Sequence, residues 1–175
     1  MNRSRVSATF GNLGFPSAGM TRYAEALWQG EQTLPDARNR FMASGAAELV
    51  REALSLGPQV MCLDTACASS LYAIKIACNQ LQDGSVDLAL AGAVNCADDL
   101  FIHVGFTALS AMSKSGQSRP FHADADGLVP AEGAAFVALK RLEDARNDAD
   151  HIYGVIRGVG LSNDGRGRGF LLLLL

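Results

Sequence analysis

The sequence predicts an α/β fold, in which helices cover a largely parallel sheet. Three observations lead to this expectation. Apolar stretches of strand length alternate along the chain with longer segments of helical periodicity. The apolar run at 86–94 is typical of a strand whose two faces are both covered. With 175 residues, 49% of them hydrophobic and 19% charged, the chain is long enough to enclose a core.

The first third of the chain contains two predicted helices. Residues 16–31 carry apolar side chains at helical spacing, with Ser17 as the N-cap. This apolar face comprises Met20, Tyr23, Ala24, Leu27 and Trp28. Residues 39–58 repeat the pattern, and Gly57 and Pro58 end the helix. Its apolar face comprises Met42, Ala46, Leu49, Val50, Ala53 and Leu54. We expect these faces to pack against the core.

The middle of the chain reads as strand, helix and strand. Residues 59–63 form a short apolar run that predicts a buried strand. Residues 68–82 are helical in length and composition, and Lys75 is their only formal charge. Because apolar side chains nearly surround the axis, this helix should be buried on most sides. Gly84 ends it, and the strand at 86–94 follows.

The last third is less regular. Residues 98–109 are mixed in character and receive no assignment. The composition of 113–127 predicts a loop. A strand is expected at 133–142, a short helical turn at 143–150 and a final strand at 151–164.

Charge and hydropathy exclude two classes of partner. The net charge is −3, with 15 basic and 18 acidic residues, which argues against non-specific nucleic-acid binding. The first residues, MNRSRVSATF, lack the apolar core of a signal peptide. No run approaches the roughly 20 apolar residues of a membrane span. We therefore expect a cytoplasmic protein with neither nucleic acid nor membrane as a partner.

The cysteines and histidines show no metal-binding spacing. Cys62, Cys67, Cys78 and Cys96 contain no CxxC pair, which is typical of reduced thiols in the cytoplasm. Three of them, Cys62, Cys78 and Cys96, lie in apolar runs and are expected in the core. The histidines are scattered at His103, His122 and His151. No metal and no other cofactor is predicted.

The stretch DTACASS, residues 64–70, places Cys67 between a predicted strand and a predicted helix. The unpaired amides and the dipole of a helix N-terminus favour a thiolate, and they can also hold an oxyanion. The small neighbours Ala66, Ala68, Ser69 and Ser70 leave room for a substrate. The local pattern leaves two interpretations open: a nucleophile at a tight turn, or a buried and inert cysteine.

Longer motifs narrow this choice. The segments DTACASSLYAIKIAC, DLALAGAVN, ALSAMSKSGQSRPFHADADGLVPAEGAAFVALKRLEDA and GVIRGVGLSNDGRG together resemble the β-ketoacyl synthases, the condensing enzymes of fatty-acid and polyketide synthesis. The wording of residues 105–127 is similar to ketosynthases of multidomain polyketide and polyunsaturated fatty-acid synthases. The resemblance extends from about the start of the chain to Gly169.

The resemblance implies a thiolase-like layered α/β fold, of which this chain is an N-terminal-half fragment with a mixed, largely parallel sheet. It implies that Cys67 accepts an acyl group from the phosphopantetheine of an acyl carrier protein. A malonyl-type thioester then loses carbon dioxide, and its carbanion attacks the acyl-cysteine. By resemblance, the Cys67 N–H is half of an oxyanion hole, and Glu132 belongs to a buried polar network near the active site. The family is usually homodimeric, and residues 58–63 are the interface candidate.

The sequence also departs from the family pattern. The catalytic histidine motifs of the family lie downstream of Gly169, and no histidine of this chain matches them. We therefore expect residues 1–169 to be a partial ketosynthase domain that is inactive by itself, and 170–175 to be a non-native-looking leucine tail. One alternative is a truncated, inactive remnant that acts at most as a binding module. A weaker one is a relative of thiolase or hydroxymethylglutaryl synthase.

Three charged or glycine-rich stretches have competing interpretations. The acids of HADADG, residues 122–127, fit a loop with Asx turns better than a calcium loop. The glycines of 165–169 fit a flexible loop better than a phosphate cradle. Lys114 and Arg119 could attract an acidic carrier protein, although solvated surface charge is the simpler interpretation.

Overall fold

The computed structural model describes residues 2–13, 26–30, 44–96 and 100–162, for the last range without the side chains of Leu100 and Phe101. The chain divides into two compact units, the first comprising Met1–Asp99 with Ala131–Ile152 and the second Leu100–Pro130 with Tyr153–Leu175. Within the described segments, no helix combines the length and the apolarity needed to cross a bilayer.

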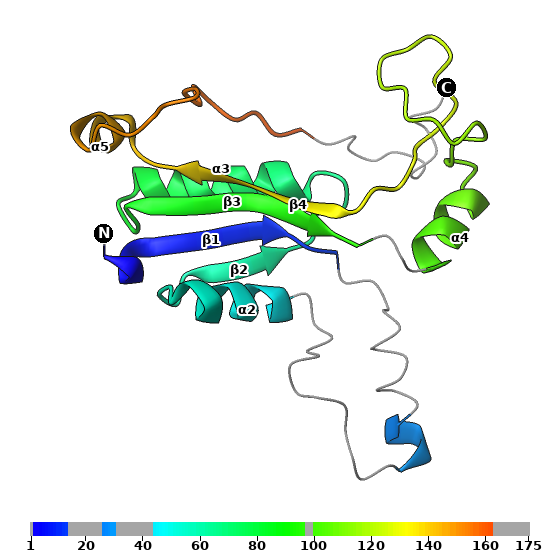
Figure 1. Ribbon diagram of the computed structural model, residues 1–175, viewed down its shortest axis with the longest axis horizontal. Coiled ribbons are helices and arrows are strands. Elements are labelled where there is room, and N and C mark those ends of the chain that lie inside the picture. Colours follow the sequence, from blue (N-terminus) through cyan, green and yellow to red (C-terminus); the bar gives the residue numbers. More distant parts are fainter. Residues whose placement is uncertain (1, 14–25, 31–43, 97–99, 163–175) are drawn as a thin grey trace. The chain divides into compact units, whose positions relative to one another are not determined.

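A four-stranded sheet forms the centre of the first unit (Figure 1). Its strands are β1 (Val6–Gly11), β2 (Val60–Leu63), β3 (Leu88–Asn95) and β4 (Gly133–Leu139). They lie in the order β2-β1-β3-β4, with β1 parallel to β2 and β3, and β4 antiparallel to β3. The mixed, largely parallel sheet and the predicted strands at 59–63, 86–94 and 133–142 are confirmed. The predicted burial of the first of these is wrong, because no residue of β2 is buried and Met61 is 41% exposed.

The central strand β1 is the element that the sequence analysis missed. In residues 6–11, Val6, Ala8 and Phe10 alternate with Ser7 and Thr9, and the whole strand is buried. Such alternation is typical of a strand with one face in water. Here both faces are covered, so the two hydroxyl side chains lie in the interior, each of them fully buried.

Two helices cover opposite faces of the sheet. The helix α3 (Ser69–Gln82) packs against β1 and β3, with Ala77 and Leu81 in one cluster with Ala89 and Ala91. The helix α2 (Ser44–Leu54) packs against β2 and β1 and places the Ala47 backbone at the Cys62 thiol. Cys62, on the side of α2, lies opposite Phe10 in the strand pairing, and Ala91, on the side of α3, lies opposite Thr9. Because neighbouring residues of a strand point to opposite faces, the two helices contact alternate residues of β1.

The apolar faces predicted for the first two helices are confirmed only in part, since Ala46 and Val50 are half-buried while the other described members are exposed. In α2, Gly45 and Ala47 are buried, whereas Leu49 and Leu54 are exposed. The small residues allow the helix to approach the strands closely, so it docks on a face that hydrophobicity alone does not select. In residues 26–29, which are helical, Trp28 is exposed. The other predicted contacts that lie outside the described residues are Ser17, Met20, Tyr23, Ala24 and Met42.

The helix α3 is confirmed, but its predicted burial on most sides is wrong. One face is buried, and it consists of Ser69, Ala73, Ala77 and Leu81. On the other side Leu71 is 61% exposed. A helix that is apolar on all sides is expected to be covered on all sides, but the described residues fully cover only one face of α3.

The remaining elements are short. A 3₁₀ turn, η1 (Arg3–Arg5), precedes β1. The helix α5 (Leu142–Asn147) follows β4, which confirms the helical turn predicted there. In the second unit, α4 (Leu100–Ala108) is a helix in the region that received no assignment from the sequence. The predicted strand at 151–164 does not form over 151–162, and its last residues lie outside the described chain. An extended segment forms a strand only where its backbone groups pair with a neighbouring strand. Residues 151–162 have no such pairing with the described strands, and the apolar side chains of Val155 and Ile156 are exposed.

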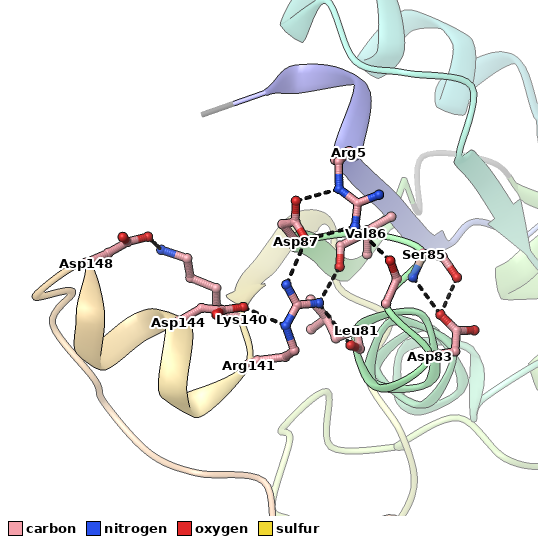
Figure 2. A network of polar contacts seen from close by, with 11 residues as sticks. Arg5, Leu81, Asp83, Ser85, Val86, Asp87, Lys140, Arg141, Asp144 and Asp148 are labelled. Carbon is pink, nitrogen blue, oxygen red and sulfur yellow. Dashed lines mark hydrogen bonds and ion pairs between the residues drawn. The ribbon is translucent and has the colours of Figure 1, made fainter.

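A charged cluster closes the end of the sheet at which β1 and β3 begin (Figure 2). The Asp87 carboxylate accepts hydrogen bonds from Arg5 Nε at 2.6 Å and from Arg141 Nη2 at 2.7 Å. The same guanidinium groups donate to the Gly84 carbonyl at 2.7 Å and to the Val86 carbonyl at 2.7 Å. We call Arg5, Asp87 and Arg141 the charged clamp. The two arginines hold the Asp87 pKa well below its usual range.

Candidate active site

Cys67 lies in the turn between β2 and α3. The strand ends at Leu63 and the helix begins at Ser69, so the predicted position of the cysteine between strand and helix is confirmed. Its side chain is exposed. Ala68 is the N-cap and offers no side-chain cap to the helix. The alternative of a buried cysteine is therefore wrong for this residue.

Hydrogen bonds between residues close in sequence shape this turn, which we call the cysteine turn (residues 64–68). The Asp64 carboxylate accepts from the Ala66 N–H at 2.9 Å, and the Ser69 N–H donates to the Ala66 carbonyl at 3.1 Å. Ala66 adopts a φ of 52°. A residue with a Cβ pays roughly 1–2 kcal/mol for this left-handed conformation, so the surrounding contacts must hold the turn in place.

The chemistry available at the cysteine turn comes from the helix that follows it. The 14 residues of α3 align their peptide dipoles toward the turn, and the amides at a helix start stabilise negative charge. A thiolate, or the oxyanion formed when a thiolate attacks a thioester, benefits from this field. The arrangement therefore suits a cysteine nucleophile.

The other three cysteines differ from Cys67 and from one another. Cys62 and Cys78 are half-buried, and burial raises the pKa of the Cys62 thiol although a backbone hydrogen bond from Ala47 opposes this. Cys96, predicted in the core, is instead exposed. It lies just beyond the end of β3, and its Sγ donates to Glu132 Oε1 at 3.6 Å. The strand β3 ends at Asn95, one residue before Cys96, so this thiol lies outside the part of the sheet that is covered.

Cys67, Cys96 and Glu132 lie at the same edge of the sheet. The strands β1, β2 and β3 are parallel, so their carboxyl ends meet at one edge, and antiparallel β4 begins there. Asn95 Nδ2 donates to the Ala131 carbonyl at 2.5 Å, which ties the end of β3 to the segment before β4. Glu132 is exposed, so its predicted place in a buried network is wrong, although it shares this edge with Cys67.

Sequence reasoning missed Gly11, and it assigned Ser69 only as a small neighbour and not as a hydrogen-bonding residue of the cysteine turn. Gly11, at the end of β1, contacts the start of α3, and the Ser69 hydroxyl is bonded back into the turn. A glycine directly after the alternating run of 6–10 was the signal for a close backbone approach. The close approach at Gly11 was not predicted because β1, the strand that it ends, was not predicted.

The acidic loop of the second unit is held by serines. Asp126 accepts from Ser113 Oγ at 2.6 Å and from the Ser115 N–H at 2.8 Å. These hydrogen bonds lower the pKa of Asp126 to about 2. Arg119 donates to the Gln117 side chain, and residues 165–169 lie outside the described chain. Among the described residues, no group of three or more His, Cys, Asp or Glu side chains could hold a metal ion.

Comparisons of sequence place these features beside known proteins. Residues 6–145 match the family described as "Beta-ketoacyl synthase, N-terminal domain". The chain is 42% identical over 136 residues to a polyunsaturated fatty acid synthase of a Thraustochytrium species, covering 76% of this chain and 7% of that protein. It is also 42% identical over 134 residues to a phenolphthiocerol/phthiocerol polyketide synthase of Mycobacterium tuberculosis, covering 74% and 7%. The chain thus spans less than a tenth of the length of these relatives.

Comparisons of structure agree. An oxazolomycin ketosynthase domain from Streptomyces albus superposes with a TM-score of 0.79 at 29% identity, covering 95% of this chain and 29% of that one. The ketosynthase of module 6 of the Bacillus subtilis bacillaene synthase gives 0.75 at 31% identity, covering 96% and 27%. A ketosynthase solved with its acyl-carrier protein gives 0.73 at 26% identity, covering 87% and 41%. The thiolase-like α/β fold expected from the resemblance is confirmed.

Proposed function

The chain belongs to the β-ketoacyl synthase family, and on that premise we propose that Cys67 is its acyl-accepting nucleophile. The observation that carries this proposal is an exposed thiol in a tight turn at the start of a long helix. The Cys67 thiolate attacks the carbonyl carbon of an acyl thioester and forms a new C–S bond. The bond to the departing sulfur breaks, and that thiolate takes up a proton.

The start of α3 supports the tetrahedral intermediate of this transfer. The backbone N–H of Cys67 supplies half of an oxyanion hole, as the family resemblance implies. The dipole of α3 adds a favourable field at the same place. Both contributions are fixed by backbone geometry, so they cost no reorganisation during the reaction.

The second step belongs to the whole synthase. A malonyl-type thioester loses carbon dioxide, and the resulting carbanion attacks the carbonyl of acyl-Cys67, which releases the cysteine and extends the chain by two carbons. This step needs groups that stabilise an enolate. His103, His122 and His151 do not match the histidine motifs of the family. The 175-residue chain by itself therefore accepts an acyl group but does not condense it.

Two partners follow from this function. The acyl and malonyl groups arrive on the phosphopantetheine of an acyl carrier protein, a class of protein with which one ketosynthase of similar structure was solved. The second partner is another copy of the ketosynthase. β2 is an edge strand that pairs on one side with β1, and Met61 on it is 41% exposed. Residues 58–63 therefore remain the candidate dimer interface.

Self-acylation tests the proposal. The full chain is incubated with hexanoyl-N-acetylcysteamine, a small thioester, and modified peptides are identified by mass spectrometry. We expect the hexanoyl group on Cys67, and its loss in Cys67→Ala. Cys96→Ala is the matched control, because that variant removes the other exposed cysteine. A folded chain that takes up no acyl group, or labels Cys96 equally, contradicts the proposal and supports an inactive binding remnant.

A further inference from the structure

The Ser69 hydroxyl is bonded to two backbone groups of the cysteine turn, the Thr65 N–H and the Ala66 carbonyl. Ser69 is the first residue of α3, and its side chain is buried, with 6% of the residue exposed. Its Oγ accepts from the Thr65 N–H at 3.0 Å and donates to the Ala66 carbonyl at 2.6 Å. One hydroxyl therefore spans the residue with the left-handed φ, directly before the nucleophile. Hydroxyl groups at helix starts ordinarily cap the helix, whereas this one points back into the turn.

Gly11 provides the space in which Ser69 lies. A Cβ placed on Gly11 would be 2.6 Å from Ser69 Cβ and 3.3 Å from the Ser70 nitrogen. The first distance is closer than real Cβ atoms approach, so any larger residue at 11 would push the start of α3 away from β1. The next N–H along the chain, that of Asn12, donates to the Leu63 carbonyl at 3.1 Å. The end of β1 thus contacts both sides of the cysteine turn.

Gly92 is also closely packed against its neighbours, and it allows the effect of tight packing to be distinguished from the positioning of Cys67. A Cβ on Gly92, in β3, would be 2.0 Å from the Ala135 carbonyl oxygen and 2.9 Å from Phe136 Cα. This contact joins β3 to β4 and involves no residue of the cysteine turn. Gly11 and Gly92 are therefore both needed for tight packing, but only Gly11 lies against the helix start that follows Cys67.

We propose that Ser69 and Gly11 are positioning residues for Cys67: the Ser69 hydroxyl fixes the peptide groups before the nucleophile, and Gly11 lets the start of α3 rest on β1. This inference rests on the proposed function, in which Cys67 is the acyl acceptor. Neither residue touches the thioester. Both act by holding the thiol and the amides at the start of α3 in one arrangement, which suits the tetrahedral intermediate.

The experiment measures self-acylation of the full chain by hexanoyl-N-acetylcysteamine in Ser69→Ala and Gly11→Ala. We expect the rate at saturating thioester to fall about 10- to 100-fold, since misplacement of reacting groups by about 1 Å has effects of that size, with the half-saturating concentration unchanged. Ser85→Ala is the matched control, because it removes a hydroxyl that binds Asp83 at the other end of α3. Gly92→Ala is the control for packing, and its folded fraction should react at the parent rate.

Two outcomes overturn the inference. The first is that Ser69→Ala reacts like Ser85→Ala. The second is that every loss matches the unfolded fraction seen by circular dichroism. If the parent chain does not acylate, the proposed function fails, and the iodoacetamide labelling ratio of Cys67 to Cys96 still decides the positioning role. That ratio should fall at least about threefold in Ser69→Ala as the amides lose their alignment, and an unchanged ratio contradicts the inference.

Discussion

The two ends of the central sheet are built on opposite principles. Where β1 and β3 begin, three charged side chains bind one another and several backbone carbonyls, and the Lys140 ammonium adds ion pairs with Asp148 and Asp150. Where β1, β2 and β3 end, small residues and a left-handed alanine surround an exposed thiol. The first end contributes connections between distant segments, and the second presents a reactive group.

This difference shows how the fold divides its tasks. The charged clamp joins residues 5, 87 and 141, which are far apart in the sequence, so it secures the order of the strands. The cysteine turn is held mostly by local hydrogen bonds and by Gly11. Open α/β sheets place their ligands at the carboxyl ends of the strands, and this chain follows that rule with Cys67.

The largest expected effect comes from a substitution in β1, the central strand that runs between the two ends of the sheet. Phe10 is fully buried, and its ring meets that of Phe136 edge-to-face with centroids 5.3 Å apart. Phe10→Ala should cost about 3–5 kcal/mol of the free energy of unfolding, a large part of a typical domain's total. Denaturation with urea, followed by circular dichroism, measures this loss. Phe121→Ala is the control, since that ring is exposed. Equal stability of the two variants would show that the ends do not depend on β1.

A substitution in the charged clamp should separate stability from reactivity. Asp87→Asn leaves two guanidinium groups without their carboxylate, so the melting temperature should fall by several degrees. The folded protein should still acylate Cys67 within about twofold of the parent rate, because the change lies at the far end of the sheet. Asp83→Asn, in the same turn, is the matched control. A marked loss of acylation by folded Asp87→Asn would contradict the division of tasks.

The same carboxylate predicts an acid-sensitive stability. Because the pKa of Asp87 is lowered in the folded state, its stabilisation is present above the unfolded pKa of about 3.9 and is lost as the pH falls below it. The melting temperature of the parent should therefore drop more steeply than that of Asp87→Asn between about pH 5 and pH 2. Parallel curves for the two proteins would show that the clamp does not stabilise the fold through this charge.

Cys67 and Cys96, which lie at the same edge of the sheet, should differ in the reactivity of their thiols. Cys67 precedes a helix start, whereas Cys96 lies beside the Glu132 carboxylate, whose charge repels a thiolate. Iodoacetamide should label Cys67 about tenfold faster than Cys96, and the half-buried Cys62 and Cys78 more slowly still. Peptide mass spectrometry over a time course measures the rates. Glu132→Gln should raise the rate at Cys96 and narrow the difference, whereas equal rates for all four cysteines would contradict the assignment.

The smallest expected effect concerns two strained alanines, one near each end. Ala66 has a φ of 52° and Ala149, after α5, a φ of 56°. Glycine at either position should raise the free energy of unfolding by up to about 1 kcal/mol, because it removes the steric cost of this conformation. Only Ala66→Gly should also slow the acylation of Cys67, since it loosens the cysteine turn. If Ala149→Gly slows acylation equally, the strain at Ala66 has no special role.

Local patterns in the sequence were sufficient for the helix and strands that flank Cys67. The run at 60–63, the small residues of 64–68 and the helix at 69–82 follow from composition and spacing. Long motifs supplied the family. The burial of Cys96 was predicted wrongly, because burial depends on where the strand ends in the sheet, and an apolar run in the sequence does not fix that boundary. The buried place of Glu132 was implied by the family resemblance, and the residue is exposed.

By itself, then, the sequence determined that a cysteine follows a strand and precedes a helix, because both signals are local. Only the tertiary structure decided that the unrecognised strand β1 lies at the centre of the sheet, that Gly11 rests against Ser69, and that Asp87 binds one arginine that precedes β1 and one that follows β4. These contacts join residues 54 to 82 positions apart, and no periodicity within a single segment encodes such pairings.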